Sequence, residues 1–297
     1  MSIRWGVSPI AWANDDMPEL GGDTPLESIL CDVSELGFDG VELGGKFPRD
    51  PETLAPLLRR HGLALVGGWY SGSLLAQDAG AEIAALQPHL RLLEAMGSTV
   101  FVFAETSNAI HGARGTPMMA TPRLAPDAWA RFGARMTAVA DHVAARGLKF
   151  AYHHHLGTVV ETAADLDAFL AHTGDTVGLT LDTGHAALGG IDALATIDAH
   201  PGRIAHVHCK DIRRERHRDA RTAGRSFLDG VLEGMFTVPG DGSLDYAALM
   251  QALKRVGYSG WIVVEAEQDP ALADPRTFAD LGLRTLRQRA ADAGLAG

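Results

Sequence analysis

Segments with helical periodicity that end in glycine and lead straight into short apolar runs recur along the whole chain. Gly37, Gly62, Gly97, Gly147 and Gly257 each separate an amphipathic segment from the next apolar run. Glycine is favoured there because the residue after a helix often takes a left-handed backbone conformation. Short strands that alternate with helices are typical of βαβ units and parallel sheets. The repeat therefore restricts the chain to an α/β fold.

Strands and helices are expected to alternate eight times. The strands are predicted at residues 3–8, 38–43, 63–69, 99–104, 148–154, 177–182, 203–209 and 260–266. The helices are predicted at residues 24–36, 50–61, 79–96, 126–146, 162–172, 190–199, 243–256 and 275–292. The first helix carries its own start signal, with Thr24 at the N-cap and Pro25 at the first helical position.

Eight β/α units can form a closed barrel or an open, doubly wound sheet. An open sheet that binds dinucleotides carries a G-x-G-x-x-G pattern after its first strand, and this chain has no such pattern there. A barrel with typical insertions needs about 250 residues, and the chain has 297. We therefore predict a single-domain (β/α)8 TIM barrel over residues 1–297, without a nucleotide cofactor.

Charge and cysteine content limit the partners and the compartment. The formal net charge is −11, which disfavours nucleic acids and anionic membranes because these require basic patches. Cys31 and Cys209 form neither a C-x-x-C motif nor a disulfide framework. No apolar run approaches the roughly 18 residues of a membrane span, and the chain begins with a strand-like segment instead of a leader. We expect a cytoplasmic protein with no membrane partner, and a homo-oligomer.

Two long connections, 105–125 and 210–242, follow predicted strands. In a barrel such connections lie on the face that carries active sites, so both are candidate lids. The second contains the arginine-rich stretch from Arg213 to Arg225. This stretch is either a solvated loop or a cover whose arginines, Arg214 among them, bind an oxygen-rich substrate.

Polar side chains stand at the ends of the last four predicted strands. The strand ends are His153-His154-His155, Asp182-Thr183-Gly184-His185, His206-Val207-His208-Cys209-Lys210 and Glu265-Ala266-Glu267. Residues two apart in a strand share a face, and a barrel brings all its strand ends around one axis. The sequence therefore predicts one polar centre that these four ends share.

A set of histidine and carboxylate ligands is typical of a divalent cation such as Mn²⁺, Co²⁺, Zn²⁺ or Fe²⁺. Cys209 lies between two inward positions and is expected to pack away from the centre. On the fifth strand either His153 or His155 can supply the ligand, because both share one face.

These strand ends resemble the xylose-isomerase-like sugar isomerases, epimerases and dehydratases. The resemblance implies a divalent-metal set in which Asp182, His208 and Glu265 are ligands. The family often reads E-N-H-x-G at the fifth strand, whereas this chain reads His153-His154-His155-Leu156-Gly157. The resemblance thus places His153 at a position that is usually Glu. This departure leaves open which residue is the fourth ligand and what total charge the ligands carry.

A narrower resemblance, to the inosose dehydratases of that superfamily, covers nearly the whole chain. It is carried by the segments 6–10, 12–16, 19–24, 40–44, 153–158 and 264–269. It implies a hydro-lyase that converts 2-keto-myo-inositol to a trihydroxycyclohexane-1,2-dione, through an enediolate that a divalent metal stabilises. Mn²⁺ or Co²⁺ is expected first, with Zn²⁺, Fe²⁺ and Mg²⁺ as alternatives.

Such a dehydration needs an acid–base pair beside the metal. His185 and Lys210 are the nearest candidates along the sequence, and Glu161 and Glu42 are alternatives for the base or for hydroxyl contacts. A lysine away from bulk water loses its proton more readily, so Lys210 could serve as a base, but the sequence does not decide which group takes the proton α to the ketone.

Carbohydrate-like substrates stack on aromatic rings while their hydroxyls meet carboxylates. The expected substrate contacts come from loops and strand ends: Trp12, Asn14, Asp15, Glu42, Trp69, His155 and Arg214. The alternative for the aromatic residues is that they pack the top of the barrel. The main alternative function is a metal-dependent isomerase or epimerase of inosose or a ketose. An endonuclease of the same superfamily and a polyol-binding barrel without activity are more distant alternatives.

Overall fold

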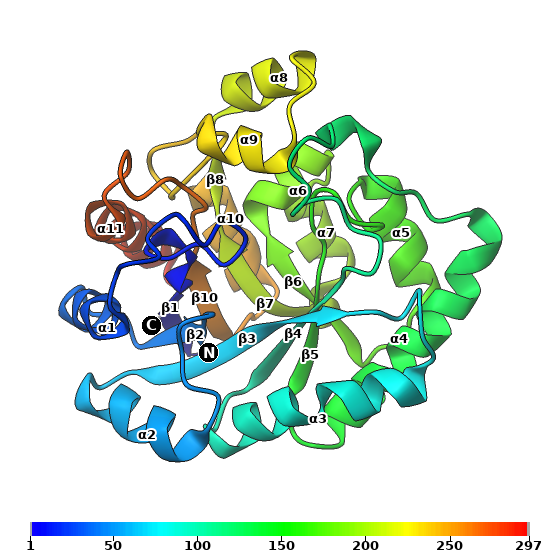
Figure 1. The fold of residues 1–297 in the computed structure, drawn as a ribbon, viewed down its shortest axis with the longest axis horizontal. Coiled ribbons are helices and arrows are strands. Elements are labelled where there is room, and N and C mark those ends of the chain that lie inside the picture. Colours follow the sequence, from blue (N-terminus) through cyan, green and yellow to red (C-terminus); the bar gives the residue numbers. More distant parts are fainter. Residues whose placement is uncertain (1, 296–297) are drawn as a thin grey trace.

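The computed structural model describes residues 2–295 and contains a closed barrel of parallel strands surrounded by helices (Figure 1). The barrel strands are β1 (Ile3–Val7), β2 (Gly40–Leu43), β3 (Ala64–Gly72), β4 (Val100–Glu105), β5 (Lys149–His153), β6 (Val177–Asp182), β7 (Ile204–Cys209) and β10 (Gly260–Val264). Each strand pairs with its sequence neighbour, and β1 pairs with β10 from Ile3↔Gly260 to Val7↔Val264. The predicted (β/α)8 barrel is confirmed.

The predicted helices are present, with small shifts at their ends. They are α1 (Leu26–Glu35), α2 (Pro51–Arg60), α3 (Ala79–Ala95), α4 (Trp129–Ala144), α5 (Ala163–His172), α7 (Ala193–Ala199), α10 (Tyr246–Arg255) and α11 (Pro275–Ala293). α1 begins at Leu26, two residues after the predicted start of the range, and its N-cap is Pro25 instead of Thr24, without a side-chain cap. The five punctuating glycines all have a left-handed φ between 67° and 86°, as predicted.

Two kinds of element were absent from the prediction. A short helix, α6 (Thr183–Gly189), follows β6 without a loop. The connection after β7 holds α8 (Arg214–Thr222), α9 (Phe227–Leu232) and a hairpin of β8 (Asp211–Ile212) with β9 (Phe236–Thr237). Figure 1 shows α8 and α9, in yellow, as an outgrowth beyond the helical ring.

The two long connections, residues 105–125 and 210–242, contact each other. Pro117 forms an isolated antiparallel bridge with Ser226, and Met118 donates a backbone hydrogen bond to the carbonyl of Arg225. The first connection is also tied to the end of β5, because Ile110 donates to the carbonyl of Gly157. The two connections are therefore joined to each other and to the segment that follows β5.

The barrel interior has an apolar floor and a polar upper layer. Val66, Val102, Ala151, Trp261 and Val263 form a separate buried cluster inside the strands. Continuing the alternation by two residues places His153 above Ala151 on β5, and Glu265 above Val263 after β10. The cluster between strands and helices is larger and apolar. The strand pattern thus directs buried polar side chains to one end of the barrel.

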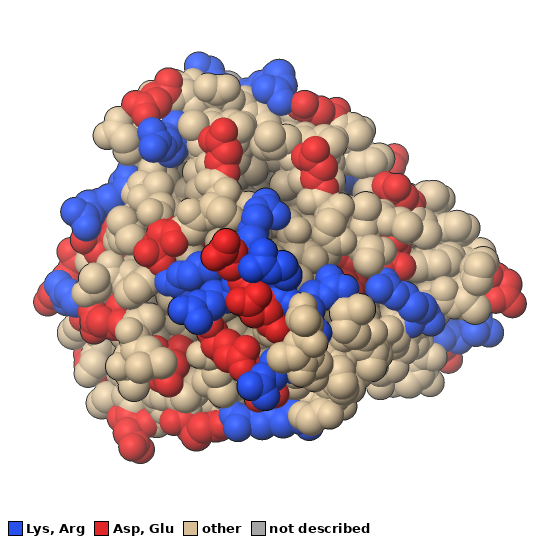
Figure 2. Space-filling model, turned by 90° about the horizontal axis from the view of Figure 1, so that it is seen from above, with Lys and Arg blue, Asp and Glu red and all other residues tan. Residues whose placement is uncertain are grey.

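Within residues 2–295, the structure has no helix that is both long enough and apolar enough to cross a membrane. Figure 2 shows basic and acidic side chains intermixed on one face of the molecule.

Candidate active site

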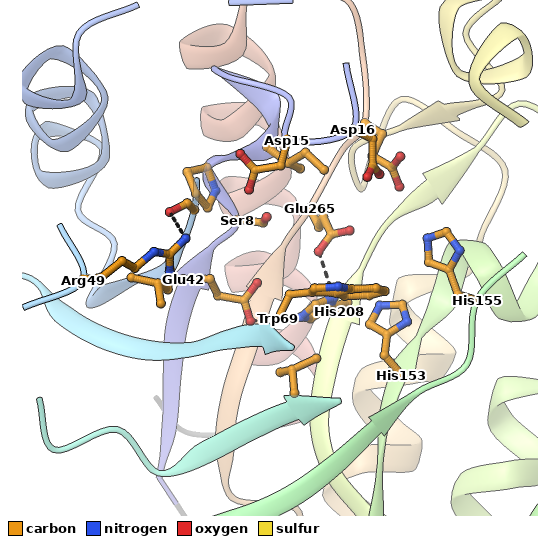
Figure 3. Close-up of a pocket in the computed structure, with 16 residues that line it drawn as sticks. Ser8, Asp15, Asp16, Glu42, Arg49, Trp69, His153, His155, His208 and Glu265 are labelled. Atoms are coloured by element: carbon orange, nitrogen blue, oxygen red, sulfur yellow. Dashed lines mark hydrogen bonds and ion pairs between the residues drawn. The ribbon is translucent and has the colours of Figure 1, made fainter. Parts of the chain in front are cut away.

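A cavity of about 210 Å³ opens at the carboxyl ends of the barrel strands (Figure 3). Drug-sized ligands occupy pockets of roughly 300–1,000 Å³, so this cavity suits a smaller molecule, about the size of one sugar ring. Its floor is formed by strand-end residues and its rim by residues of the β1 and β2 loops. The lining includes Ser8, Asp15, Asp16, Glu42, Arg49, Trp69, His153, His155, His208, Glu265 and Glu267.

Four strand ends converge on one point beneath this cavity. One potential ligand atom each from His153, Asp182, His208 and Glu265 lies within 4.8 Å of the others, and all four residues are buried. Asp182 Oδ2 lies 3.8 Å from both His153 Nε2 and His208 Nδ1, and His208 Nδ1 lies 2.8 Å from Glu265 Oε2. Two atoms that each lie about 2.1 Å from one ion are at most about 4.2 Å apart. These distances suit a shared divalent ion.

Asp182 has a buried oxygen atom with which a cation could pair. Its Oδ1 accepts a hydrogen bond from the backbone N–H of His185, whereas its buried Oδ2 has no hydrogen-bond partner among the described residues. A buried, unpaired carboxylate oxygen is costly, and burial raises the pKa of Asp182 to about 6. An ion at this point would supply the missing partner.

The structure places His153, and not His155, in this group of four. His153 Nδ1 is held 2.8 Å from the carbonyl oxygen of His154, so Nε2 is the nitrogen that faces Asp182. His155 belongs to a neighbouring group with His185 and Glu267. Burial lowers the pKa of His153, His155 and His185 well below the usual value. All three imidazoles are therefore neutral near pH 7, which is the form that ligates metals.

Glu42 of β2 holds the far side of His208. Its Oε1 lies 2.9 Å from His206 Nε2 and 3.1 Å from His208 Nε2. Burial acts to raise the pKa of Glu42, but His208 and His206 outweigh it and lower the pKa to about 2. A carboxylate bonded to the second nitrogen of a metal-ligating histidine fixes the ring and its tautomer. Glu42 is thus placed to leave Nδ1 of His208 facing the metal position.

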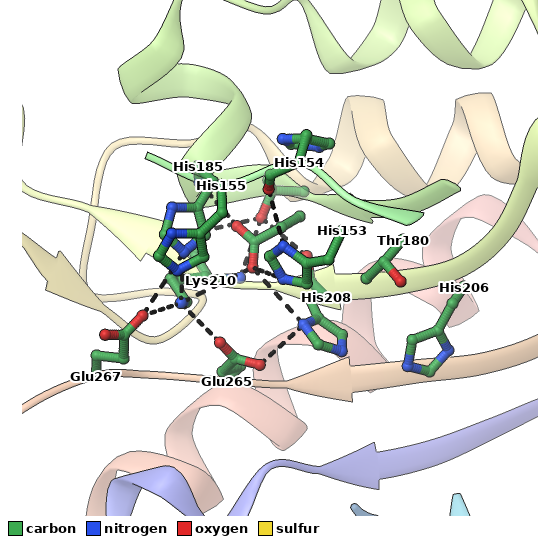
Figure 4. A network of polar contacts seen from close by, with 12 residues as sticks. His153, His154, His155, Thr180, His185, His206, His208, Lys210, Glu265 and Glu267 are labelled. Atoms are coloured by element: carbon green, nitrogen blue, oxygen red, sulfur yellow. Dashed lines mark hydrogen bonds and ion pairs between the residues drawn. The ribbon is translucent and has the colours of Figure 1, made fainter. Parts of the chain in front are cut away.

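Lys210 lies at the centre of the neighbouring group (Figure 4). Its Nζ lies 2.6 Å from Glu265 Oε1, 2.5 Å from Glu267 Oε1 and 3.1 Å from His185 Nε2. Burial alone would lower its pKa, but Glu265, Glu267 and Asp182 together raise it above the usual value. The expected loss of its proton is therefore corrected: the surrounding carboxylates hold Lys210 as an ammonium ion.

Loop residues form the other side of the cavity. Asp15 and Asp16 are exposed at its rim, and Asp15 accepts hydrogen bonds from the backbone N–H of Gly45. The Trp69 side chain is 36% exposed, and its ring lies edge-on to His153 at 5.2 Å between centroids. His111, from the connection after β4, packs 4.9 Å from His155. An aromatic surface and two carboxylates thus line the cavity together with the strand-end residues.

Four residues predicted to act in the site lie outside this cavity. Trp12 is buried in the core and donates to Asp32, while Asn14 accepts from the backbone N–H groups of Asp16 and Met17 and so shapes the first loop. Glu161 accepts from Gly157 N and Thr121 Oγ1. Arg214 is exposed on α8 and lines a separate cavity with α6, α7 and α10. None of the four lines the cavity, so their predicted roles in catalysis or substrate binding find no support in these positions.

The family whose description reads "Xylose isomerase-like TIM barrel" matches residues 30–289. The chain belongs to the xylose isomerase-like TIM-barrel family. Solved structures agree in fold: an L-ribulose 3-epimerase superimposes with a TM-score of 0.68 at 20% identity, covering 99% of this chain and 96% of that one.

Within the xylose isomerase-like family, curated relatives match the chain over nearly its full length. It is 46% identical to the rhizopine catabolism protein MocC of Rhizobium meliloti, over 99% of this chain and 90% of that protein. It is 39% identical to an inosose dehydratase of Lacticaseibacillus casei, over 94% of each chain, and 39% identical to one of Geobacillus thermodenitrificans, over 93% of this chain and 94% of that protein. The resemblance to inosose dehydratases is confirmed.

Sequence reasoning gave no role to several residues that this family site brings together. Glu267 and His206 share a face with Glu265 and His208 through the two-residue alternation, so the signal for both was present. Asp16 had a signal too, because it lies in the same loop as Asp15. His111 and Arg49 had none, since each lies in a connection whose path follows from tertiary contacts.

Proposed function

We propose that the protein is a metal-dependent hydro-lyase that dehydrates 2-keto-myo-inositol to 3D-(3,5/4)-trihydroxycyclohexane-1,2-dione. The substrate is supported by relatives 36–39% identical that carry the name inosose dehydratase. The observation that carries the proposal is the site itself, in which a four-residue ligand group adjoins a second buried group able to transfer protons.

His153, Asp182, His208 and Glu265 would hold the divalent ion, with Mn²⁺ or Co²⁺ as the first candidates. When bound, the ion supplies Lewis-acid stabilisation of the charge that develops as the proton α to the ketone leaves. Two neutral imidazoles and two carboxylates balance the charge of a divalent ion. This balance leaves the ion a stronger Lewis acid than a set with three carboxylates would.

The proton transfers fall to groups that line the cavity. Dehydration breaks a C–H bond, whose proton goes to a base, and a C–O bond, whose hydroxyl leaves as water after taking a proton. Glu267 and His155 line the cavity, and Glu267 Oε2 has no hydrogen-bond partner among the described side chains. We assign the two transfers to this pair.

His185 and Lys210 act behind that pair as positioning residues. The His185 ring packs against His155 at 3.7 Å between centroids, and Lys210 donates to Glu267 Oε1. Neither lines the cavity, so we assign neither of them a direct contact with the substrate. Their contacts fix the orientation of the groups that do.

The rim residues would hold the polyol ring. Trp69 offers an aromatic surface for the C–H face of a cyclic polyol, and the exposed carboxylates of Asp15 and Asp16 can accept hydrogen bonds from its hydroxyls. Arg49 lines the same cavity and can donate to a substrate oxygen.

The test is turnover of 2-keto-myo-inositol after chelation and after readdition of Mn²⁺ or Co²⁺. The proposal expects a product that has lost one water and absorbs in the ultraviolet as a conjugated dione, and only with metal present. A product of unchanged mass would instead show an isomerase or epimerase. Stabilisation by ligand without turnover would show a binding protein.

A further inference from the structure

Two groups of potential metal ligands lie side by side in the barrel. The first is His153, Asp182, His208 and Glu265, and the second is His155, His185 and Glu267, all buried. In the second group, His185 Nε2 lies 3.6 Å from Glu267 Oε1, a separation that two ligands of one ion can have. The residue types in both groups suit a divalent cation.

Glu265 connects the two groups through its two oxygen atoms. Its Oε2 lies 2.8 Å from His208 Nδ1, on the side of the first group. Its Oε1 lies 2.6 Å from Lys210 Nζ, on the side of the second group. A carboxylate with one oxygen toward each of two positive centres is typical of sites that hold two metal ions about 3.5–4 Å apart.

The Lys210 ammonium stands where the second ion of such a pair would stand. It contacts Glu265, Glu267 and His185, and it lies 3.9 Å from Asp182 Oδ2. Two of these contacts, Glu267 and His185, are members of the second group (Figure 4). A lysine has three donors and no acceptor, so it can satisfy the carboxylate oxygens as a cation does.

The three carboxylates nearest to Lys210 Nζ balance in charge with one ion and one lysine. Asp182, Glu265 and Glu267 carry three negative charges when ionised, and a divalent ion with the ammonium supplies three positive ones. Glu42 lies on the far side of His208 and pairs with the imidazoles of His206 and His208. All these groups are buried, so an unbalanced charge among them would be costly. Without Lys210, one buried carboxylate would lack a counter-charge.

We propose that Lys210 occupies a second cation position, so that the protein binds a single divalent ion, and that removal of the ammonium opens a second metal site formed by His155, His185 and Glu267. The inference rests on the proposed metal site of the first group. The ammonium supplies a fixed positive charge that cannot dissociate, and it keeps His155 and Glu267 free for the substrate.

Metal stoichiometry tests the inference without any activity assay. Wild type and Lys210→Met are stripped with a chelator and titrated with Mn²⁺ during equilibrium dialysis, and spin coupling between neighbouring Mn²⁺ ions is followed by electron paramagnetic resonance. We expect about one ion per chain in wild type and about two, spin-coupled, in Lys210→Met. Lys210→Arg, which retains a cation, should bind about one, and Lys210→Met/Glu267→Gln should return to about one.

Each outcome separates the inference from the proposed function. A wild type that binds no ion refutes the proposed metal site itself. A wild type that binds two ions, or a folded Lys210→Met that binds only one, overturns the inference alone. A Lys210→Met chain that folds only in excess Mn²⁺ supports it, and one that excess Mn²⁺ does not rescue overturns it.

Discussion

The two sides of the cavity are built by different means. On the side of β5, β6, β7 and β10, His153, Asp182, His208 and Glu265 are buried and stand on strand ends. On the side of the β1 and β2 loops, Asp15, Asp16 and Arg49 are exposed, and Glu42 is the buried exception. Buried charges are stable only when paired, whereas exposed ones are screened by water. The buried carboxylates of the strand side could therefore be stabilised by a bound cation, and the loop side can adapt to a ligand.

The largest expected effect is the loss of the ion from the strand side. Asp182→Asn retains the oxygen that caps α6 at His185 N and removes the charge that faces the metal position. We expect bound Mn²⁺ to be lost and turnover to fall by about 10³-fold or more, since the Lewis acid contributes several kcal/mol. Metal analysis and dione formation measure both effects.

Glu161→Gln is the matched control, because Glu161 lies on the same face but outside the cavity, bonded to Gly157 and Thr121. It should keep both metal and turnover. Full metal occupancy in Asp182→Asn would remove Asp182 from the ligand set.

His153, at the end of β5, and His155, two residues later, test which residue of the strand side binds the metal. His153→Ala should weaken Mn²⁺ binding by more than the roughly 10–100-fold that outer-shell changes cost, because His153 Nε2 faces Asp182. His155→Ala should keep the metal and lower turnover, because His155 lies in the second group. A metal titration of the two variants measures this. The reverse pattern would make His155 the ligand, and intact binding in both would show that β5 supplies none.

Substitution of Glu42 tests whether a residue on the loop side contributes to metal binding on the strand side. Glu42→Ala removes the partner of His208 Nε2 and should weaken Mn²⁺ binding by roughly 10–100-fold. The dissociation constant is measured without substrate, so that lost substrate contacts do not contribute. Glu42→Gln, which retains an acceptor oxygen, should recover part of the affinity. Unchanged affinity in Glu42→Ala would restrict Glu42 to substrate contacts.

The smallest expected effect comes from the exposed rim. Trp69→Ala removes the aromatic surface above His153 and should raise KM by roughly 2–12-fold, since such contacts contribute about 0.5–1.5 kcal/mol. Metal content and kcat should change little. Trp12→Phe is the control: it should lower the melting temperature and leave KM unchanged, because Trp12 is buried beside Asp32. A large loss of metal in Trp69→Ala would contradict the division between the two sides.

The strand side could be predicted from the sequence because its geometry repeats. Asp182, His208 and Glu265 stand at strand ends, and a regular two-residue alternation gives their direction. The choice between His153 and His155 could not be made, since both share one face. It depends on which ring adjoins Asp182 in three dimensions.

The remaining errors have physical reasons. α6 is only seven residues long and begins directly at the end of β6, so it has too little periodicity to be recognised. On α8 only His217 and Ala220 are buried. The arginine-rich stretch therefore has no apolar face that would predict a helix. The pKa of Lys210 was predicted in the wrong direction because the approach of Glu267 and Glu265 is a tertiary contact.

The pairing of the first barrel strand with the last sets an order for biosynthesis. Ile3 of β1 pairs with Gly260 of β10. At roughly 5–20 residues per second, the ribosome reaches β10 between about ten seconds and a minute after it has made β1. Until then the barrel is open, and Glu265, which follows its last strand, has not been made. The polar layer is therefore completed only at the end of translation. Only the closed barrel, with all four proposed ligands in place, can therefore select one metal ion over another. The histidines of the nascent chain can contact any free metal in the cell before that.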